Sequence, residues 1–209
     1  MELLLHPTYF PNVISLRCLQ EGGVVWEVWD NYQKQTYRNR CYICTDRGRQ
    51  MLNIPIRHSG GANGRQRYRD VQIDNTYPWQ RQHWRSLETA YRAAPFFEYY
   101  ESRLRKIFEE EFETLLDLNL STARLLCELL EIDFPEATST AYEAEPNEKQ
   151  DLRFLAGAKT PLDLDFPSYP QVFEDRHPFV ANLSGLDLLF NEGKLAGEYL
   201  KKISLPVQS

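Results

Sequence analysis

The segment "ELLLHPTYFPNVISLRCLQEGGVVWEVWD" (residues 2–30) contains the strongest indication of the fold class of this chain. It begins with a short apolar run that stops at His6-Pro7. A helical pattern of apolar residues follows over 13–19, directly after Asn12, a residue suited to capping a helix. A second apolar run over 22–30 reads as another strand. A strand, a helix and a strand in this order place two parallel strands side by side through a right-handed crossover.

The rest of the chain predicts one hairpin and then mostly helices. "CYICTDRGRQMLNIPI" (41–56) reads as two strands around a turn, and "VQID" (71–74) as one further strand. Helical patterns cover 78–94, 96–116, 118–132 and 182–193, and a short helix is expected near 148–157. Residues 138–150 and 160–179 read as irregular. We expect a single α/β domain over 1–209: a mostly parallel N-terminal sheet with an antiparallel hairpin, flanked by several helices.

Composition excludes several classes of protein. The chain has 209 residues, of which 42% are apolar and 26% charged. No apolar run approaches the roughly 20 residues of a membrane-spanning helix, and the start lacks the features of a signal peptide. Cys41 and Cys44 form a CxxC inside a predicted strand, where residues three apart face opposite sides. We therefore expect buried thiols, no metal and a reducing, cytoplasmic compartment.

Charge is distributed unevenly along the sequence. Residues 34–92 contain twelve Lys and Arg against four Asp and Glu, a net charge of +8 within a chain whose net charge is −6. This asymmetry favours an anionic ligand, such as a phosphate, a nucleotide or a nucleic acid, over the basic part. A solvated arginine-rich surface explains the same composition.

Two polar runs follow the predicted strands of the first segment, "HPTYFPN" (6–12) and "DNYQKQTYRNR" (30–40). Ligands gather at the carboxyl ends of parallel strands, so both runs are candidates for one site. In an extended strand Lys34, Arg38 and Arg40 would face one side and could clamp a phosphate or carboxylate. Gln33 and Asn39 would face the other side. An exposed edge strand protected by charge is the alternative.

His83 and His6 are the candidate catalytic residues. A neutral imidazole can take a proton from an attacking amine or hydroxyl. The alternative is a core histidine at position 83 and a structural turn at position 6. Asn182 and Asn191 belong to a polar C-terminal motif, in which Ser184 and Asp187 have the spacing of a helix cap. The predicted substrate-binding residues are Tyr9, Asn31, Gln33, Lys34, Arg38, Asn39, Arg40, Asn182 and Asn191.

The segment "RHSGGANGRQRYRD" (57–70) reads as a glycine-rich loop with flanking arginines. It could close over an anion as a lid, or it could be a disordered excursion. It is not a P-loop, because no GK[ST] follows, and the chain has neither a GxGxxG motif nor a metal-ligand spacing. We expect no cofactor and no metal.

Four stretches together carry a resemblance: "HPTYFP" (6–11), "YQKQTYRNR" (32–40), "HWRSLETAYRAAPFFEYY" (83–100) and "NLSGLDLLFNEG" (182–193). In this order they resemble the WbqC-like protein family over the whole chain. His6 stands where many relatives have Gln. The resemblance implies a place in bacterial O-antigen or other surface polysaccharide biosynthesis, and a role in transferring an aminoacyl group, glycine, onto a sugar amine.

We therefore expect a transferase that acts on a sugar or nucleotide-sugar. Its substrate would be a small anionic or sugar-like molecule. A non-catalytic carbohydrate-binding protein and a nucleic-acid or tRNA binder are the alternatives, the latter because aromatic residues accompany the basic segment. The sequence leaves the donor, the acceptor, the strand order and the oligomeric state open.

Overall fold

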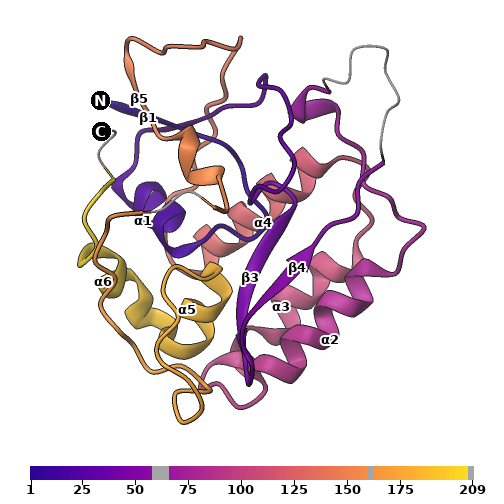
Figure 1. The fold of residues 1–209 in the computed structure, drawn as a ribbon, viewed down its shortest axis with the longest axis vertical. Helices are drawn as coiled ribbons and strands as arrows, with labels where there is room; N and C mark the ends of the chain where they lie inside the picture. Colours follow the sequence, from indigo (N-terminus) through magenta and orange to yellow (C-terminus); the bar gives the residue numbers. More distant parts are fainter. Residues whose placement is uncertain (58–65, 160–161, 207–209) are drawn as a thin grey trace.

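The computed structural model describes residues 1–57, 66–159 and 162–206. The fold class expected from the sequence is confirmed: an α/β protein with a parallel sheet, an antiparallel hairpin and flanking helices (Figure 1). The elements follow one another in the order β1 (Glu2–Leu5), α1 (Val13–Glu21), β2 (Val24–Trp26), β3 (Arg40–Thr45), β4 (Gly48–Asn53), η1 (Tyr68–Asp70), α2 (Trp79–Tyr91), α3 (Phe97–Glu109), α4 (Leu115–Leu129), β5 (Lys149–Asp151), η2 (Arg153–Ala156), α5 (Gly185–Glu192), η3 (Gly193–Leu195) and α6 (Ala196–Lys201).

The first segment of the sequence forms the predicted parallel pair. β1 lies in the centre of a three-stranded sheet of order β2-β1-β5, with Leu3 opposite Val24 and both neighbours parallel to β1. The side chain of Asn12 accepts a hydrogen bond from the backbone N–H of Ser15, so it caps α1 as predicted. The carboxyl ends of three parallel strands therefore meet at one edge of the sheet.

The predicted hairpin forms a separate two-stranded sheet. β3 and β4 pair from Arg40 opposite Asn53 to Thr45 opposite Gly48. Gly48 has a φ of 87°, a left-handed conformation that glycine adopts without steric cost. Backbone hydrogen bonds at residues 37–39 connect the start of the hairpin to neighbouring loops. The hairpin is thus held beside the parallel sheet rather than within it.

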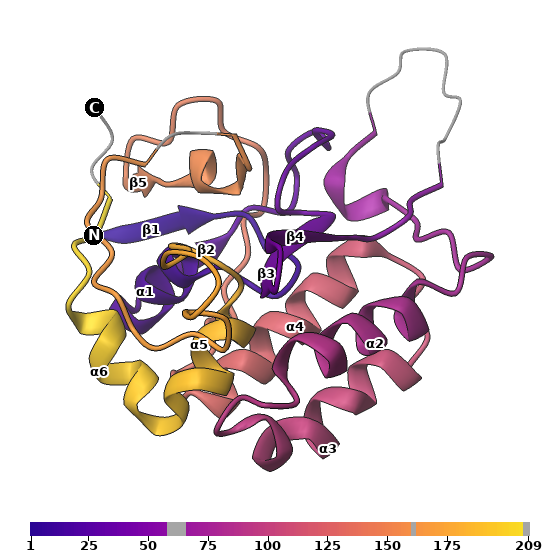
Figure 2. The ribbon, with the colours of Figure 1, turned by 60° about the horizontal axis from the view of Figure 1, so that its bottom comes forward.

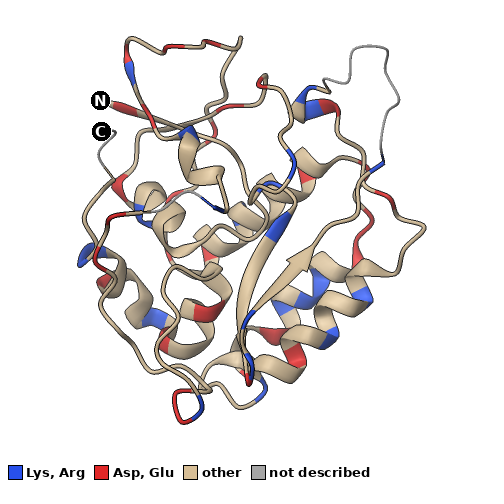
Figure 3. Cartoon of the chain, in the orientation of Figure 1, with Lys and Arg blue, Asp and Glu red and all other residues tan. Residues whose placement is uncertain are grey.

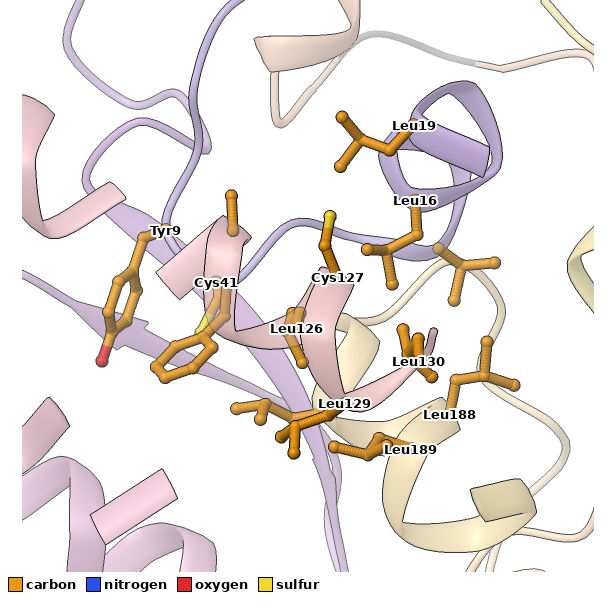
Figure 4. Packing of buried hydrophobic residues seen from close by; sticks show 14 of the residues in the cluster. Tyr9, Leu16, Leu19, Cys41, Leu126, Cys127, Leu129, Leu130, Leu188 and Leu189 are labelled. Atoms are coloured by element: carbon orange, nitrogen blue, oxygen red, sulfur yellow. The ribbon is translucent and has the colours of Figure 1, made fainter. Parts of the chain in front are cut away.

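The helices form a layer below the strands in Figure 2. Leucines from α1, α4 and α5 interdigitate in the core, among them Leu16, Leu126 and Leu189, all fully buried (Figure 4). Gly185, the first residue of α5, packs so tightly against Leu16 that a Cβ atom would collide with it. Burial of these apolar stripes supplies the main driving force for folding.

Two expectations about elements were wrong. No strand forms over 71–74, where Gln72 and Ile73 make only isolated bridges, to Thr114 and Ile56. The helix expected over 96–116 ends at Glu109. Residues 110–114 leave the helix because their backbone pairs with residues 71–73, and the Thr114 hydroxyl then caps α4 by accepting from the N–H of Asp117.

The short helix expected near 148–157 forms only in part, since residues 149–151 pair in parallel with β1 as β5. The last part of that range forms η2. Residues 32–39 do not form an extended strand: 34–35 and 37–38 are turns, and Gln35 has a φ of 63°. The glycine-rich part of the predicted lid, 58–65, lies outside the described residues.

All four cysteines are buried and free, as predicted for Cys41 and Cys44. Over residues 1–57, 66–159 and 162–206, no three His, Cys, Asp or Glu side chains are grouped to hold a metal ion. None of the helices described is both long and apolar enough to span a bilayer.

Candidate functional site

A buried polar cluster lies at the carboxyl end of β1 and β2. His6 directly follows β1, and its Nδ1 lies 3.2 Å from the carbonyl oxygen of Glu27, which directly follows β2. Its Nε2 contacts the guanidinium of Arg38 and lies 3.1 Å from the carboxylate of Asp30. The sequence-based expectation that polar side chains meet at this edge is therefore confirmed for His6 and Arg38.

The geometry indicates which ring nitrogen of His6 carries the proton. A guanidinium can only donate, so Nε2 accepts from Arg38 and Nδ1 donates to the carbonyl of Glu27. Burial lowers the pKa of His6 from 6.5 to about 4, and the positive charge of Arg38 also lowers it, although Asp30 acts in the opposite direction. His6 is thus neutral at pH 7, with both nitrogens occupied by protein groups.

The three cations of the 34–40 run do not share one face. Arg38 is 2% exposed and donates hydrogen bonds to Asp30 at 3.2 Å and to the carbonyl of Asn31 at 2.9 Å. Lys34 is exposed and Arg40 is half-buried. The expected common face required an extended strand, and the turns at residues 32–39 rotate Arg38 into the interior instead.

Lys34 and Arg40 meet at a hollow of about 510 Å³ between the start of the hairpin and the segment before α2. We call it the amide hollow, because the amides of Gln35, Asn39 and Asn53 contribute to its wall. Its lining comprises Tyr32, Lys34, Gln35, Asn39, Arg40, Asn53, Ile54, Pro55, Ile56, Asp74 and Tyr77. Three of the predicted substrate-binding residues, Lys34, Asn39 and Arg40, are brought together here.

Three buried polar atoms of the amide hollow have no hydrogen-bond partner among the described residues: the hydroxyl of Tyr32, Oδ1 of Asn39 and Nε of Arg40. The amide nitrogen of Asn39 is satisfied, since it donates to Oδ1 of Asn53 at 3.0 Å. Burying a polar group without a partner costs roughly 1–3 kcal/mol, so three such atoms in the lining residues of one hollow call for a partner such as water or a ligand. In the described part of the chain neither Lys34 nor Arg40 forms an ion pair.

His83 lies behind this wall rather than in it. It is 5% exposed on α2, and its Nδ1 lies 3.0 Å from the hydroxyl of Tyr9. Burial lowers the pKa of His83 to about 4, and a backbone hydrogen bond at Asn53 raises this pKa by a smaller amount. Asn53 therefore adjoins both places, with its side chain in the amide hollow and its backbone beside the imidazole.

The remaining predicted residues lie away from the amide hollow. Tyr9 is buried against His83, whereas Asn31 and Gln33 are exposed. Asn182 lies at the N-terminal end of α1, where its Oδ1 accepts from the N–H of Ile14 at 3.0 Å. Asn191 donates to the carbonyl of Asp187 at 2.8 Å. None of these five side chains lines the amide hollow.

Asp187 has a role that its spacing from Ser184 did not indicate. Ser184 caps α5, as predicted, by accepting from the N–H of Leu186, but Asp187 does not take part in the cap. Its carboxylate is fully buried and accepts from the hydroxyls of Tyr169 at 2.7 Å and Tyr91 at 2.9 Å. It also accepts from the amide of Gln171 at 3.0 Å. Burial raises the pKa of Asp187, and these donors counter that rise.

Comparison with known proteins defines the class. The model of the WbqC-like protein family matches residues 24–160, and this chain belongs to that family. An uncharacterised protein of Mycobacterium tuberculosis, Rv1507c, is 30% identical over 196 residues, which cover 81% of this chain and 84% of the relative. No solved structure matches the chain. The matched region contains the hairpin and the amide hollow.

Proposed function

We propose that the amide hollow binds a sugar or nucleotide-sugar and that the protein is a transferase acting on it. One observation carries this proposal: the unpartnered hydroxyl of Tyr32, Oδ1 of Asn39 and Nε of Arg40 all belong to residues of one hollow. A sugar hydroxyl both donates and accepts, so it can satisfy such atoms once the side chains turn them toward the hollow.

The charges of the hollow favour an anionic substituent on that ligand. Lys34 and Arg40 supply two cations against one carboxylate, Asp74, and a guanidinium binds phosphate through two parallel hydrogen bonds. Tyr77 is 60% exposed beside them and offers an aromatic face for a base or a sugar ring. These features together match the parts of a nucleotide-sugar.

Transfer requires a base for the incoming amine or hydroxyl, and His83 remains the predicted base. It is neutral at pH 7 and adjoins the hollow through Asn53. The transferred group proposed is an aminoacyl group such as glycyl, in surface polysaccharide biosynthesis, which follows from the family resemblance. A folded His83→Asn protein should bind the substrate normally and lose turnover, whereas full turnover would exclude His83 as the base.

The binding step can be tested by calorimetric titration with UDP-N-acetylglucosamine, UDP and N-acetylglucosamine. We expect the nucleotide-sugar to bind most tightly, and Arg40→Gln or Lys34→Gln to weaken it about tenfold. Lys202→Gln is the matched control, because Lys202 is exposed next to α6 and lines no part of the hollow. An equal loss in the control, or no binding of any of the three probes, would refute the proposal.

A specific observation favours nucleic-acid binding as the second candidate. The guanidiniums of Arg67 and Arg69 lie 5.5 and 4.3 Å from the ring of Trp29, and both arginines are exposed. Basic and aromatic groups arranged in this way contact phosphates and stack on bases. Single-stranded RNA binding whose affinity falls steeply with salt, and is lost in Trp29→Ala, would support this candidate over the first.

A further inference from the structure

A second hollow lies at the opposite end of the hairpin. It has a volume of about 440 Å³ and lies between the hairpin turn, the second half of α2 and the loop 168–180. Figure 1 shows the tip of the hairpin next to this loop at the bottom of the view. We call it the loop hollow, and its lining comprises Thr45, Asp46, Gln50, Arg85, Ser86, Thr89, Ala90, Phe173 and Arg176.

The loop hollow has more positive than negative charge. Arg85 projects from α2 and forms no ion pair with any residue of the described ranges. Arg176 lies across the hollow on the loop, with its guanidinium 3.6 Å from the carboxylate of Asp46. Basic residues recur along α2, as the blue segments of Figure 3 show. Two guanidiniums facing a single carboxylate leave one of them available for an anion.

The remaining lining suits a hydroxylated molecule. Phe173 presents an aromatic ring, which packs well against the apolar face of a sugar. Gln50 and Ser86 contact each other at 3.4 Å, and Thr89 lies one turn of α2 after Arg85. Amide and hydroxyl groups of this kind fix the orientation of a ligand within a pocket.

The loop that carries Phe173 and Arg176 is held rigidly. Gln171 closes it on itself, since its side chain accepts from the N–H of Val180 at 2.9 Å and donates to the carbonyl of Val180 at 3.1 Å. The same side chain donates to the buried Asp187. His177 contacts the carbonyl of Thr45 at 2.8 Å and so fastens the loop to the hairpin. Compact loops with tied ends are frequently functional.

We propose that the loop hollow is a second binding site, which takes a small anionic sugar through Arg85, Arg176 and Phe173. The buried anchoring at Asp187 and Gln171 fixes one wall before the ligand arrives, so little conformational entropy is lost on binding. The anion, a carboxylate or a phosphate, binds between the two guanidiniums, and the ring lies against Phe173. The site is separate from the amide hollow, with which it shares no lining residue.

Titration of the full chain with glucose 6-phosphate, glucuronate, inorganic phosphate and glucose tests this proposal. We expect at least one of the two anionic sugars to bind more tightly than both phosphate and glucose. Comparing glucose 6-phosphate with glucuronate shows whether the site prefers a phosphate or a carboxylate. Arg85→Gln and Arg176→Gln should each weaken that binding about tenfold. Both side chains are exposed, so these variants should melt at the temperature of the wild type.

Arg81→Gln is the matched control, since Arg81 lies one turn earlier on α2, is exposed and lines neither hollow. It should leave binding unchanged. Equal loss in Arg81→Gln, equally tight binding of glucose or of phosphate alone, or no binding of any probe at millimolar concentration would each overturn the proposal. If the probes for the amide hollow do not bind, the results for Arg85→Gln and Arg176→Gln still test the loop hollow.

Discussion

The hydroxyl of Tyr9 lies 3.0 Å from Nδ1 of His83, inside the core and not in either hollow. The residue that the sequence singled out as a base is thus enclosed by Tyr9, Trp79 and the end of β4. Its imidazole is held neutral by burial. This enclosure has a direct consequence for the dependence of stability on pH.

The pKa of His83 is lowered from 6.5 to about 4, as is that of His6. A group whose pKa is lower in the folded state stabilises the fold above its unfolded pKa, and this stabilisation disappears as the pH falls. Between pH 7 and pH 5 we expect each histidine to remove about 2 kcal/mol from the free energy of unfolding. Urea denaturation at the two pH values measures this loss.

The His83→Gln protein should lose less stability than the wild type over the same pH range. His177→Gln is the control within the same chain, because backbone hydrogen bonds raise the pKa of the half-exposed His177. Its contribution has the opposite sign, so its removal should not reduce the acid destabilisation. Identical pH dependence in His83→Gln and wild type would contradict the assigned burial of His83.

The contact between Arg38 and His6 predicts a measurable shift in a pKa. Arg38 lowers the pKa of His6, and its guanidinium is buried beside the ring. In Arg38→Gln the pKa of His6 should rise from about 4, as followed by NMR titration of the imidazole protons. Removing one partner of a buried ion pair costs roughly 3–5 kcal/mol, so Arg38→Lys, which keeps the charge, provides a more stable comparison. An unchanged pKa in Arg38→Gln would refute the contact.

Asp187 should contribute to stability through its donors. Asp187→Asn replaces one acceptor oxygen by a donor that faces other donors, and we expect it to destabilise the fold by about 2–4 kcal/mol. Tyr169→Phe removes a single hydrogen bond to that carboxylate and should cost about 1–2 kcal/mol. Urea denaturation of both variants provides the test, and a larger loss for Tyr169→Phe than for Asp187→Asn would contradict this order.

Two glycines at the C-terminal helices should respond differently to the same substitution. A Cβ at Gly185 would collide with the side chain of Leu16 and lie 3.1 Å from the carbonyl oxygen of Pro11. Gly185→Ala should therefore destabilise the protein by about 1–3 kcal/mol. Gly197 lies inside α6, and its nearest atom would be the amide nitrogen of Gln20 at 3.6 Å. Gly197→Ala should be neutral or stabilise by up to about 1 kcal/mol.

Thermal or urea denaturation of the two alanine variants gives a direct comparison. Gly185 lies where α5 approaches α1, and only a residue without a side chain permits that distance. Equal stability of the two variants would mean that α5 and α1 are farther apart than in the present structure.

Local patterns in the sequence predicted much of the fold. Alternation, capping and turn residues located α1 with its Asn12 cap, the hairpin and α5 with its Ser184 cap. These features depend on neighbouring residues, whose backbone preferences and side-chain hydrogen bonds act over a few positions. The family, too, followed from motifs that are contiguous in the sequence.

Features that depend on distant partners could not be predicted in this way. The segment 149–151 becomes a strand only because the free edge of β1 accepts it, and α3 ends at Glu109 because residues 110–114 pair with residues 71–73. Likewise, the even spacing of Lys34, Arg38 and Arg40 predicted one cationic face of an extended strand. A turn at Gln35 instead placed Arg38 beside His6. The intrinsic secondary-structure propensity of these segments is weak, and contacts with distant parts of the chain override it.

The α/β class, the hairpin, the helix caps and the family are encoded by residues close together in the chain, so all four could be inferred without coordinates. Contacts between distant segments bring Lys34, Asn39 and Arg40 to one hollow and leave His83 behind Asn53. The tertiary structure also shows that Asp187 anchors a loop rather than capping a helix. Burial and hydrogen bonding between segments many residues apart fix these relations, and no local pattern records them.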